Sequence, residues 1–513
     1  MPPEVFCRGI EGSREVGCWR EMRGWRIGVE VCGAKGVTIC GDRFVKNKRN
    51  DMKKNIFAMA VLAALGGGGM LQAQTIGTEE LSRLQESFVL DAPTRAIQNV
   101  LTADKNIKSC ALNRELQGKI DHYFKYRVNV KGITDQKQSG RCWMFTSMNV
   151  LRPGIMEKYN IGEFDFSHNY LYFYDMLEKS NLFLENVIRT AKTDQGDREV
   201  MTLFASPVND GGVWNLYYNL ATKYGVVPAE VMPETEHSNN TNQMVSILNE
   251  SLRRTGMEIR HMAADGAKTA ALRERKMEGL EDAYRILALC LGEPPTTFTW
   301  RYKDLDGNIR ELKDYTPMQF YAEITPEGYT PDNYIMIMND PTRPYYKLYE
   351  IQNYRNSYEG LNWVYLNLPN EDIKKAALAS IKNNEAMYAS CDVGKQFNVA
   401  EGISDPTMYD YESLFGVELE MAKADRILSR QSGSSHAMTL VGCDVDSNEN
   451  PVKWEFENSW GPSAGHDGYI TFTDDWFDEY MFRLVIRKAY LDERAVEALG
   501  TKPVQLPMWD YMF

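Results

Sequence analysis

The sequence predicts an α+β fold in which helices precede most of the strands. Apolar residues make up 43% of the chain and charged residues 25%, the proportions of a folded globular protein. Helical spacing of apolar residues dominates the first two thirds, and strand-like runs gather in the last third. Because the two kinds of segment are segregated, a parallel βαβ architecture is not expected. The 513 residues suffice for one large elaborated domain or for two domains.

The first helical segments are expected at residues 78–103 and 110–125, where apolar residues have amphipathic spacing. Residues 126–140 are rich in Gly, Asp and Gln and are expected to be extended and turn-like. A helix is expected to begin at Cys142, because "CWMFTSMNVLRPGIMEKY" has helical spacing. Pro153 falls about three turns into this run and should kink or end the helix.

Two longer helical segments are expected at residues 166–193 and 240–292, the second of them highly charged. "FTWRYKDLDGNIRELKDY" then predicts a hairpin around Asp306 and Gly307, since Asp-Gly is a favoured hairpin turn. Strands are expected in "HAMTLVGCDV", "VKWEFENSW" and "GYITFTD". The expected order therefore runs from mostly helical to mostly strand.

A separate signal lies in residues 52–73, "MKKNIFAMAVLAALGGGGMLQA". Lys53 and Lys54 form a basic segment, and the apolar run that follows is too short to span a bilayer. Small residues come next, so the stretch is typical of a secretory signal peptide, with a buried core helix as the alternative. Because such signals begin a chain, we expect translation to start at Met52 and residues 1–51 to be an upstream extension. The cysteines of that extension leave a small metal-binding or disulfide domain as the alternative.

The expected mature chain, residues 74–513, would be exported, which in a bacterium places it in the periplasm. It keeps 46 of the 58 basic and 64 of the 71 acidic residues, a net charge of −18. Nucleic acid is not an expected partner, because phosphate binding needs a basic face. No stable membrane span is expected, and neither is a metal or a cofactor. Five cysteines remain, an odd number that leaves at least one without an intrachain partner.

Cys142 stands where a helix is expected to begin, and this position favours a reactive thiol. The positive end of the helix dipole and the unpaired N–H groups there stabilise a thiolate and so lower the thiol pKa. A cysteine nucleophile also needs a base, a group that orients the base, and donors for an oxyanion. Taken alone, Cys142 would more simply be a small buried apolar residue.

Three other residues offer the functions that a cysteine nucleophile needs. His436 lies in "SGSSHAMTLVGCD", where small residues lead into an apolar strand and allow the ring to face a cleft. Asn458, in "WEFENSWG", suits a strand poorly, so its side-chain oxygen is expected to accept from the imidazole N–H and fix the tautomer. Trp460 would shield that bond from water. Gln136 offers an amide that can form an oxyanion hole with the backbone N–H of Cys142.

Together, Gln136, "SGRCW", "SSHAM" and "ENSWG" resemble a papain-like cysteine peptidase, and more closely its bleomycin hydrolase/aminopeptidase C branch. Similar stretches such as "NDGGVWNLYYNLATKYGVVP" and "GHDGYITFTDDWFDEYMF" extend the likeness from about residue 126 to the C-terminus. The resemblance implies a helical left subdomain and a β-barrel-like right subdomain. The cysteine-to-histidine gap exceeds the ~130–150 residues of papain. Large helical insertions are therefore implied, with one at about residues 236–333.

The resemblance also assigns roles to the matching residues. Cys142 is the nucleophile, His436 the general base and acid, Asn458 the group that orients the histidine, and Gln136 an oxyanion donor. Gly211 and Gly212 match a glycine pair that lines the substrate, because a backbone without Cβ can lie against an extended peptide. A plain turn is the alternative for this pair. Ser139 stands where papain has a second cysteine, so the corresponding disulfide is absent.

The implied reaction is peptide hydrolysis with release of N-terminal residues. In this family the C-terminal tail enters the cleft, and its carboxylate pairs with the free amine of the substrate; Phe513 would take that place here. Only three residues follow "WD", and each missing residue removes about 3.3–3.6 Å of reach. Cleavage of internal bonds in oligopeptides is therefore an alternative. A catalytically silent binding scaffold and acyl transfer to an amine are two others. The resemblance further implies a homohexameric ring.

Overall fold

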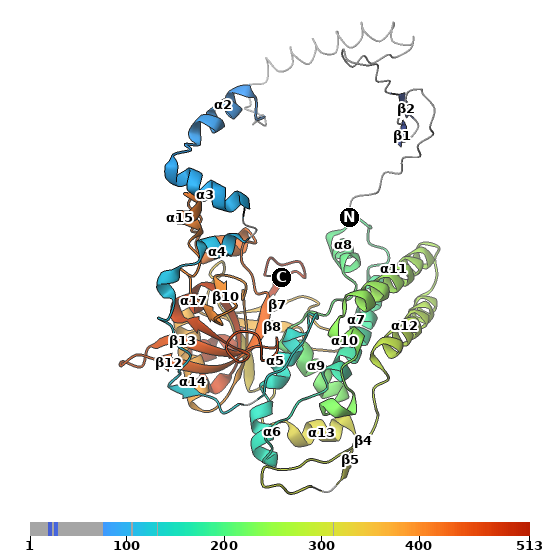
Figure 1. Ribbon diagram of the computed structural model, residues 1–513. Helices are drawn as coiled ribbons and strands as arrows, with labels where there is room; N and C mark the ends of the chain where they lie inside the picture. Colours follow the sequence, from blue (N-terminus) through green and yellow to red (C-terminus); the bar gives the residue numbers. More distant parts are fainter. Residues whose placement is uncertain are drawn as a thin grey trace, which may run out of the picture. The chain divides into compact units, whose positions relative to one another are not determined.

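The computed structural model describes residues 19–22, 25–28, 75–103, 106–130, 132–310 and 312–512 (Figure 1). The chain divides into two compact units, Met1–Thr94 and Arg95–Phe513. In the first unit, β1 (Trp19–Met22) and β2 (Trp25–Gly28) form an antiparallel pair, and α2 (Thr78–Ser87) follows later. The signal peptide expected at residues 52–73 lies outside the described residues.

The helix expected at residues 78–103 is interrupted. α2 ends at Ser87, and α3 (Ala92–Ala103) begins five residues later. Asp91 accepts a hydrogen bond from the backbone N–H of Thr94 at 2.8 Å, which caps the start of α3. Pro93 lies in the first turn, where a missing N–H costs nothing.

The helix expected at residues 110–125 does not form. α4 (Ile107–Ala111) ends just after residue 110, where the expected helix would begin. A single 3₁₀ turn follows at Arg114–Leu116. The side chain of Asn113 accepts from the backbone N–H of Glu115 at 3.1 Å, and Gly118 has a φ of 73°. Turn-forming side chains thus override the apolar spacing here.

The helical part of the second unit is built around α7 (His168–Arg189), which α9, α11 and α12 all contact. Ser167 caps α7, since its hydroxyl accepts from the backbone N–H of Tyr170 at 3.1 Å. α7 confirms the helix expected at residues 166–193, and α11 and α12 confirm the helical block expected at residues 240–292. The other helices of this part are α5 (Cys142–Asn149), α6 (Arg152–Tyr159), α8 (Arg198–Ala205), α9 (Trp214–Tyr224), α10 (Glu236–Asn239), α11 (Asn242–Ala264), α12 (Thr269–Leu291) and α13 (Pro317–Ile324).

Pro153 divides the run that begins at Cys142. α5 ends at Asn149 and α6 begins at Arg152, so the proline occupies the first turn of the second helix. The prediction that Pro153 ends the first helix is confirmed. The hairpin expected around Gly307 also forms, between β4 (Phe298–Trp300) and β5 (Lys313–Tyr315). It lies with α10 to α13 in residues 236–333, and the assignment of that range as an insertion stays a prediction.

The other part of the second unit is a twelve-stranded, mostly antiparallel sheet. Its order is β10-β11-β14-β13-β12-β9-β15-β6-β8-β7-β16, with β3 beside β12. β12, β13 and β14 confirm the three strands expected in the last third. The strands are β3 (Tyr126–Arg127), β6 (Tyr334–Met338), β7 (Lys347–Ile351), β8 (Trp363–Asn367), β9 (Met387–Cys391), β10 (Phe397–Asn398), β11 (Ile403–Ser404), β12 (His436–Val445), β13 (Pro451–Glu457), β14 (Tyr469–Thr473), β15 (Met481–Arg487) and β16 (Val504–Leu506).

Short helices accompany the sheet. They are α14 (Asn370–Lys382), α15 (Tyr411–Phe415), α16 (Lys423–Leu428), α17 (Asp474–Tyr480) and α18 (Glu493–Leu499). α14 packs against β12 and β15. None of the helices in the described ranges is both long enough and apolar enough to cross a membrane.

α5 joins the helical part to the sheet. It packs against β12, and Figure 1 shows it between the green helices and the orange-to-red sheet. The side chains of α5 after its first residue are all buried. Cys142, the first residue of α5, is thereby brought to the beginning of β12. The architecture is the α+β arrangement that the sequence predicts.

Candidate active site

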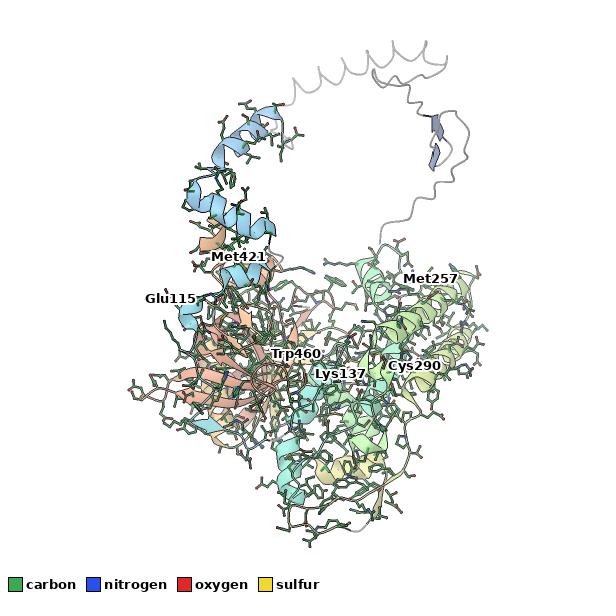
Figure 2. All side chains as sticks on the ribbon, viewed as in Figure 1. Glu115, Lys137, Met257, Cys290, Met421 and Trp460 are labelled. Atoms are coloured by element: carbon green, nitrogen blue, oxygen red, sulfur yellow. The ribbon has the colours of Figure 1, made fainter. Side chains whose placement is uncertain are left out.

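Cys142 begins α5 in a part-buried position on the wall of a cleft of about 850 Å³. The cleft lies between the two parts of the second unit. Its walls include the segment before α5, the loop before α9, and the starts of β12 and β15. Figure 2 labels two lining residues, Trp460 in the loop after β13 and Lys137 on the segment before α5. The fold thus exposes the thiol only toward this cleft.

Arg141 precedes the cysteine but does not act on the thiol. Its guanidinium is fully buried and forms a double hydrogen bond with Glu234, at 2.8 and 3.1 Å. Its Nε donates to the hydroxyl of Ser139 at 3.1 Å. Two parallel hydrogen bonds of this kind fix the orientation of the guanidinium and compensate its charge. Arg141 therefore anchors the start of α5 to the segment that precedes α10.

His436 is the first residue of β12 and is bonded to Asn458. The ring Nε2 lies 2.8 Å from Oδ1 of Asn458, just after the end of β13. The same oxygen accepts from the backbone N–H of Ser459 at 2.8 Å, which fixes which atom of the amide faces the ring. An amide oxygen only accepts, so Nε2 carries the proton and Nδ1 is left as the base. Trp460 covers this pair with its ring centroid 4.8 Å from that of His436.

Gln136 lies in the cleft and is fixed by Ser459. Its backbone N–H donates to the Ser459 carbonyl at 2.8 Å, and its Oε1 accepts from the Ser459 hydroxyl at 2.6 Å. The amide nitrogen therefore points the other way, where it donates to the carbonyl of Ser139 at 2.6 Å. An amide group has two N–H donors, so the second is left for a substrate oxygen.

Burial governs the protonation of the cysteine and histidine. Burial raises the pKa of the Cys142 thiol to about 11, although the backbone N–H groups of Trp143 and Ala437 act in the opposite direction. Burial also lowers the pKa of His436 to about 4, and the hydrogen bond to Asn458 partly offsets this. Burial therefore disfavours the charged form of each group. The lowered thiol pKa expected from the helix start is wrong, because desolvation outweighs the few N–H groups there.

Gly211 and Gly212 differ in how much room a side chain would have. A Cβ on Gly212 would lie 2.6 Å from the ring of Trp143, so only glycine lets this loop pack on α5. A Cβ on Gly211 would meet only the side chain of Asn209, at 3.1 Å. Both glycines line the cleft with Cys142. Phe513, the third residue expected to contact substrate, lies outside the described residues.

Asp210, which the sequence analysis missed, ties three segments of the site together. Its carboxylate accepts from the backbone N–H of Gly140 at 2.6 Å and from the hydroxyl of Thr241 at 2.5 Å. Its backbone carbonyl accepts from the indole N–H of Trp143 at 2.8 Å. Lys179 of α7 donates to the carbonyls on both sides of Asp210. The segment before Cys142, the glycine loop and the start of α11 are therefore held by one carboxylate.

The C-terminal tail reaches the cleft. Asp510 accepts from Arg343 at 2.5 Å, and the hydroxyls of Tyr511 and Thr342 are hydrogen-bonded. Met512 lines the cleft with Cys142, and its carbonyl accepts from Arg483 at 2.9 Å. The short tail that the sequence shows is thus long enough to bring its last described residue into the cleft.

The described cysteines and acidic groups suggest no additional chemistry. All five described cysteines are free, and Cys391 and Cys443 are buried. Across the described ranges, His, Cys, Asp and Glu side chains form no group of three or more that could hold a metal ion. The cysteine, histidine and asparagine of the cleft are therefore the arrangement to explain.

A cysteine at a helix start, a histidine at a strand start and an asparagine that fixes its tautomer define a papain-like cysteine peptidase. The chain belongs to the Peptidase C1-like family, whose profile matches residues 75–513. Within that family it belongs to the bleomycin hydrolase/aminopeptidase C branch. The resemblance that the sequence motifs indicate is confirmed.

Individual relatives cover almost the whole of this domain. The chain is 38% identical to bleomycin hydrolase of Mus musculus over 85% of this chain and 98% of that protein. It is 37% identical to aminopeptidase C of Lactobacillus delbrueckii subsp. lactis over 77% of this chain and 88% of that protein. The crystal structure of PepW from Lactobacillus rhamnosis superposes with a TM-score of 0.82 at 35% identity, covering 86% of this chain and 99% of that one.

Two replacements of Asp210 distinguish the effect of its hydrogen bonds from the effect of its charge. Asp210→Ala should lower kcat by about 10²-fold, because small displacements of reacting groups cost that much. Asp210→Asn keeps an oxygen that accepts from Gly140 and should retain most of kcat. It also removes a charge that raises the pKa of Cys142, so alkylation of the thiol should begin at lower pH. Asp197→Ala, which removes only the cap of α8, is the control. An Asn variant as inactive as the Ala variant would contradict this role.

The pH dependence of the rate should follow His436. The neutral imidazole is the base, so kcat/KM should hold down to about pH 5 and fall by half near pH 4, as the ring takes a proton. Asn458→Ala removes the bond that stabilises the protonated ring, so it lowers the pKa of His436 further. The acid limb should then move to lower pH while kcat falls. An acid limb that moves upward in Asn458→Ala would show that another group controls it.

Proposed function

We propose that this chain hydrolyses peptides through a thioester on Cys142 and releases residues from their N-termini. The observation that carries the proposal is the 2.8 Å bond between His436 and Asn458 beside the thiol. That bond leaves Nδ1 as a base, and the cleft admits an extended peptide along Gly211 and Gly212. The reaction class is acyl transfer to water.

The first half of the reaction forms the thioester. As Sγ of Cys142 attacks the peptide carbonyl, its proton passes to Nδ1 of His436, and the imidazolium is stabilised by Asn458. The carbonyl oxygen becomes an oxyanion that accepts from the backbone N–H of Cys142 and from the amide of Gln136. Collapse of this intermediate breaks the C–N bond, and His436 gives its proton to the leaving amine.

The second half returns the enzyme to its resting state. His436 takes a proton from water as the water oxygen attacks the thioester carbonyl, and the same oxyanion donors act again. Breaking the C–S bond releases the carboxylic acid, and the proton returns to Sγ. An amine in place of water would give acyl transfer, which is a side reaction of the same intermediate. A silent scaffold is disfavoured because Cys142, His436 and Gln136 line one cleft and His436 keeps its bond to Asn458.

The tail supports release of N-terminal residues over cleavage at internal bonds. Met512 occupies part of the cleft that holds Cys142, and Arg483 and Asp510 hold it there. A tail in this position leaves less room for residues that precede the scissile bond. Of the two relatives compared above, bleomycin hydrolase and aminopeptidase C, the second is named for aminopeptidase action. Oligoendopeptidase action is the alternative that the experiment below would detect.

We also propose that the chain is exported through the segment at residues 52–73 and that it assembles into a homohexameric ring. The segment's basic start, short apolar run and small residues support export. Family membership supports the ring. Export would place the enzyme where extracellular or periplasmic peptides are its substrates.

Peptides with free and acetylated N-termini should be compared directly. With matched sequences, acetylation should lower kcat/KM by at least about 10²-fold. An acetylated end has no charge to pair with the C-terminal carboxylate, and its acetyl group collides with the tail. Cys142→Ala should be inactive on both series and is the control for contaminating peptidases. Equal rates on both series would exclude obligatory release of N-terminal residues and would favour the endopeptidase alternative.

The N-terminus of the exported protein should lie near Gln74. N-terminal sequencing after secretion from a bacterial host measures this directly, because signal peptidases cut after a small-residue site such as Ala73. A host with export blocked should accumulate a longer chain that still carries residues 52–73. An exported chain that begins at Met1 would contradict the proposal.

A further inference from the structure

Arg483 is a buried cation in the wall of the cleft. It lies on β15 opposite Ser390 of β9, and both residues line the cleft with Cys142. The next residue of β9, Cys391, pairs with His436. Only 6% of Arg483 is exposed, and its guanidinium lies 4.2 Å from the ring centroid of Trp363. A positive charge is thus built into the sheet side of the cleft, two strands from the catalytic histidine.

Among the described residues, Arg483 has no carboxylate partner. Its single hydrogen bond there is donated to the backbone carbonyl of Met512 at 2.9 Å, and its Nε has no acceptor. Asp340 is the acidic residue that influences Arg483, and it lies 3.6 Å from the guanidinium of Arg343. Burial accordingly lowers the pKa of Arg483. A buried guanidinium normally has an anion beside it, because desolvating an unpaired charge is costly.

Arg483 differs from the other buried arginines near the site in this respect. Arg141 has Glu234, and Arg152 has Glu457 at 3.0 Å. Neither Arg141 nor Arg152 lines the cleft that holds Cys142. Arg483 instead lines the cleft, and its Nε has no hydrogen-bond acceptor among the described residues. Its position suits recognition of a ligand more than it suits packing.

We propose that Arg483 is the base of a carboxylate-binding subsite that accepts an acidic side chain of the peptide substrate. The guanidinium fork matches a carboxylate in shape and charge, and the low-dielectric wall formed by Tyr354, Tyr388 and Trp363 strengthens the attraction. The proposal rests on the proposed function, since it concerns the peptide bound for cleavage at Cys142. With Met512 beyond Arg483, the side chain that reaches it belongs to the residue at the N-terminal end of the substrate.

The test compares fluorogenic amides of glutamate, glutamine and leucine, each with a free amine. The intact enzyme should cleave the glutamyl amide with kcat/KM at least about tenfold above that for the glutaminyl amide, because glutamine has the same shape without the charge. Arg483→Gln should reduce this ratio to about one. Arg483→Lys keeps the charge without the fork and should restore part of the ratio. Arg487→Gln, on the same strand but bonded to Glu385, should leave the ratio unchanged.

A second measurement does not depend on any variant. Free glutamate should inhibit the intact enzyme at a concentration at least about tenfold lower than free glutamine does, since both are products of the same reaction. Equal inhibition, or equal cleavage of the glutamyl and glutaminyl amides, would overturn the proposal. A ratio that survives in Arg483→Gln would overturn it as well. Cleavage of acetylated peptides by Arg483→Gln, with a ratio already near one in the intact enzyme, would show that Arg483 only anchors the tail.

Failure of the proposed function gives a different result. If acetylated and free glutamyl peptides are cleaved equally fast, release of N-terminal residues is excluded. The ratio of glutamate to glutamine in either series still reports on Arg483. The two proposals therefore stand or fall on separate comparisons.

Discussion

The packing of α5 against β12 is the constraint on which the rest of this protein depends. It brings a thiol at the start of a helix to a histidine at the start of a strand that is 294 residues away in sequence. Burial raises the pKa of the Cys142 thiol and lowers the pKa of His436, so it disfavours the charged form of each. Both line the same cleft, and Asn458 holds Nε2 of the ring so that Nδ1 is left as the base.

The polar groups around the reacting pair maintain this geometry without a disulfide. Asp210 bonds the segment before Cys142 to the glycine loop and to Thr241 at the start of α11. Arg141 and Glu234 fix the other side of the same segment. Hydrogen bonds to charged groups are among the strongest available inside a protein, and here they hold loops rather than helices. The helical range at residues 236–333 thus contributes directly to the wall of the active site.

The tail gives the cleft its asymmetry. Met512, whose carbonyl accepts from Arg483, lines the same cleft as Gly211 and Gly212. Under the proposed function, a tail in this position distinguishes the end of a peptide from its middle by space. Under the further proposal, Arg483, buried beside the tail, adds a charge to that distinction.

The sequence by itself determined the fold class, the strands β12 to β14, the helices α7, α11 and α12, and the identity of Cys142, His436, Asn458 and Gln136. Local spacing and short motifs carry that information, because helix periodicity and family signatures are written in consecutive residues. The tertiary structure alone decided the direction of the Cys142 pKa, the bonds of Asp210 and the lack of a carboxylate partner for Arg483 among the described residues. Each depends on desolvation or on partners far along the chain, which no local pattern records. Local sequence also misled at residues 110–125, where the expected helix does not form. The turn-forming residues Asn113 and Gly118 outweighed the apolar spacing there.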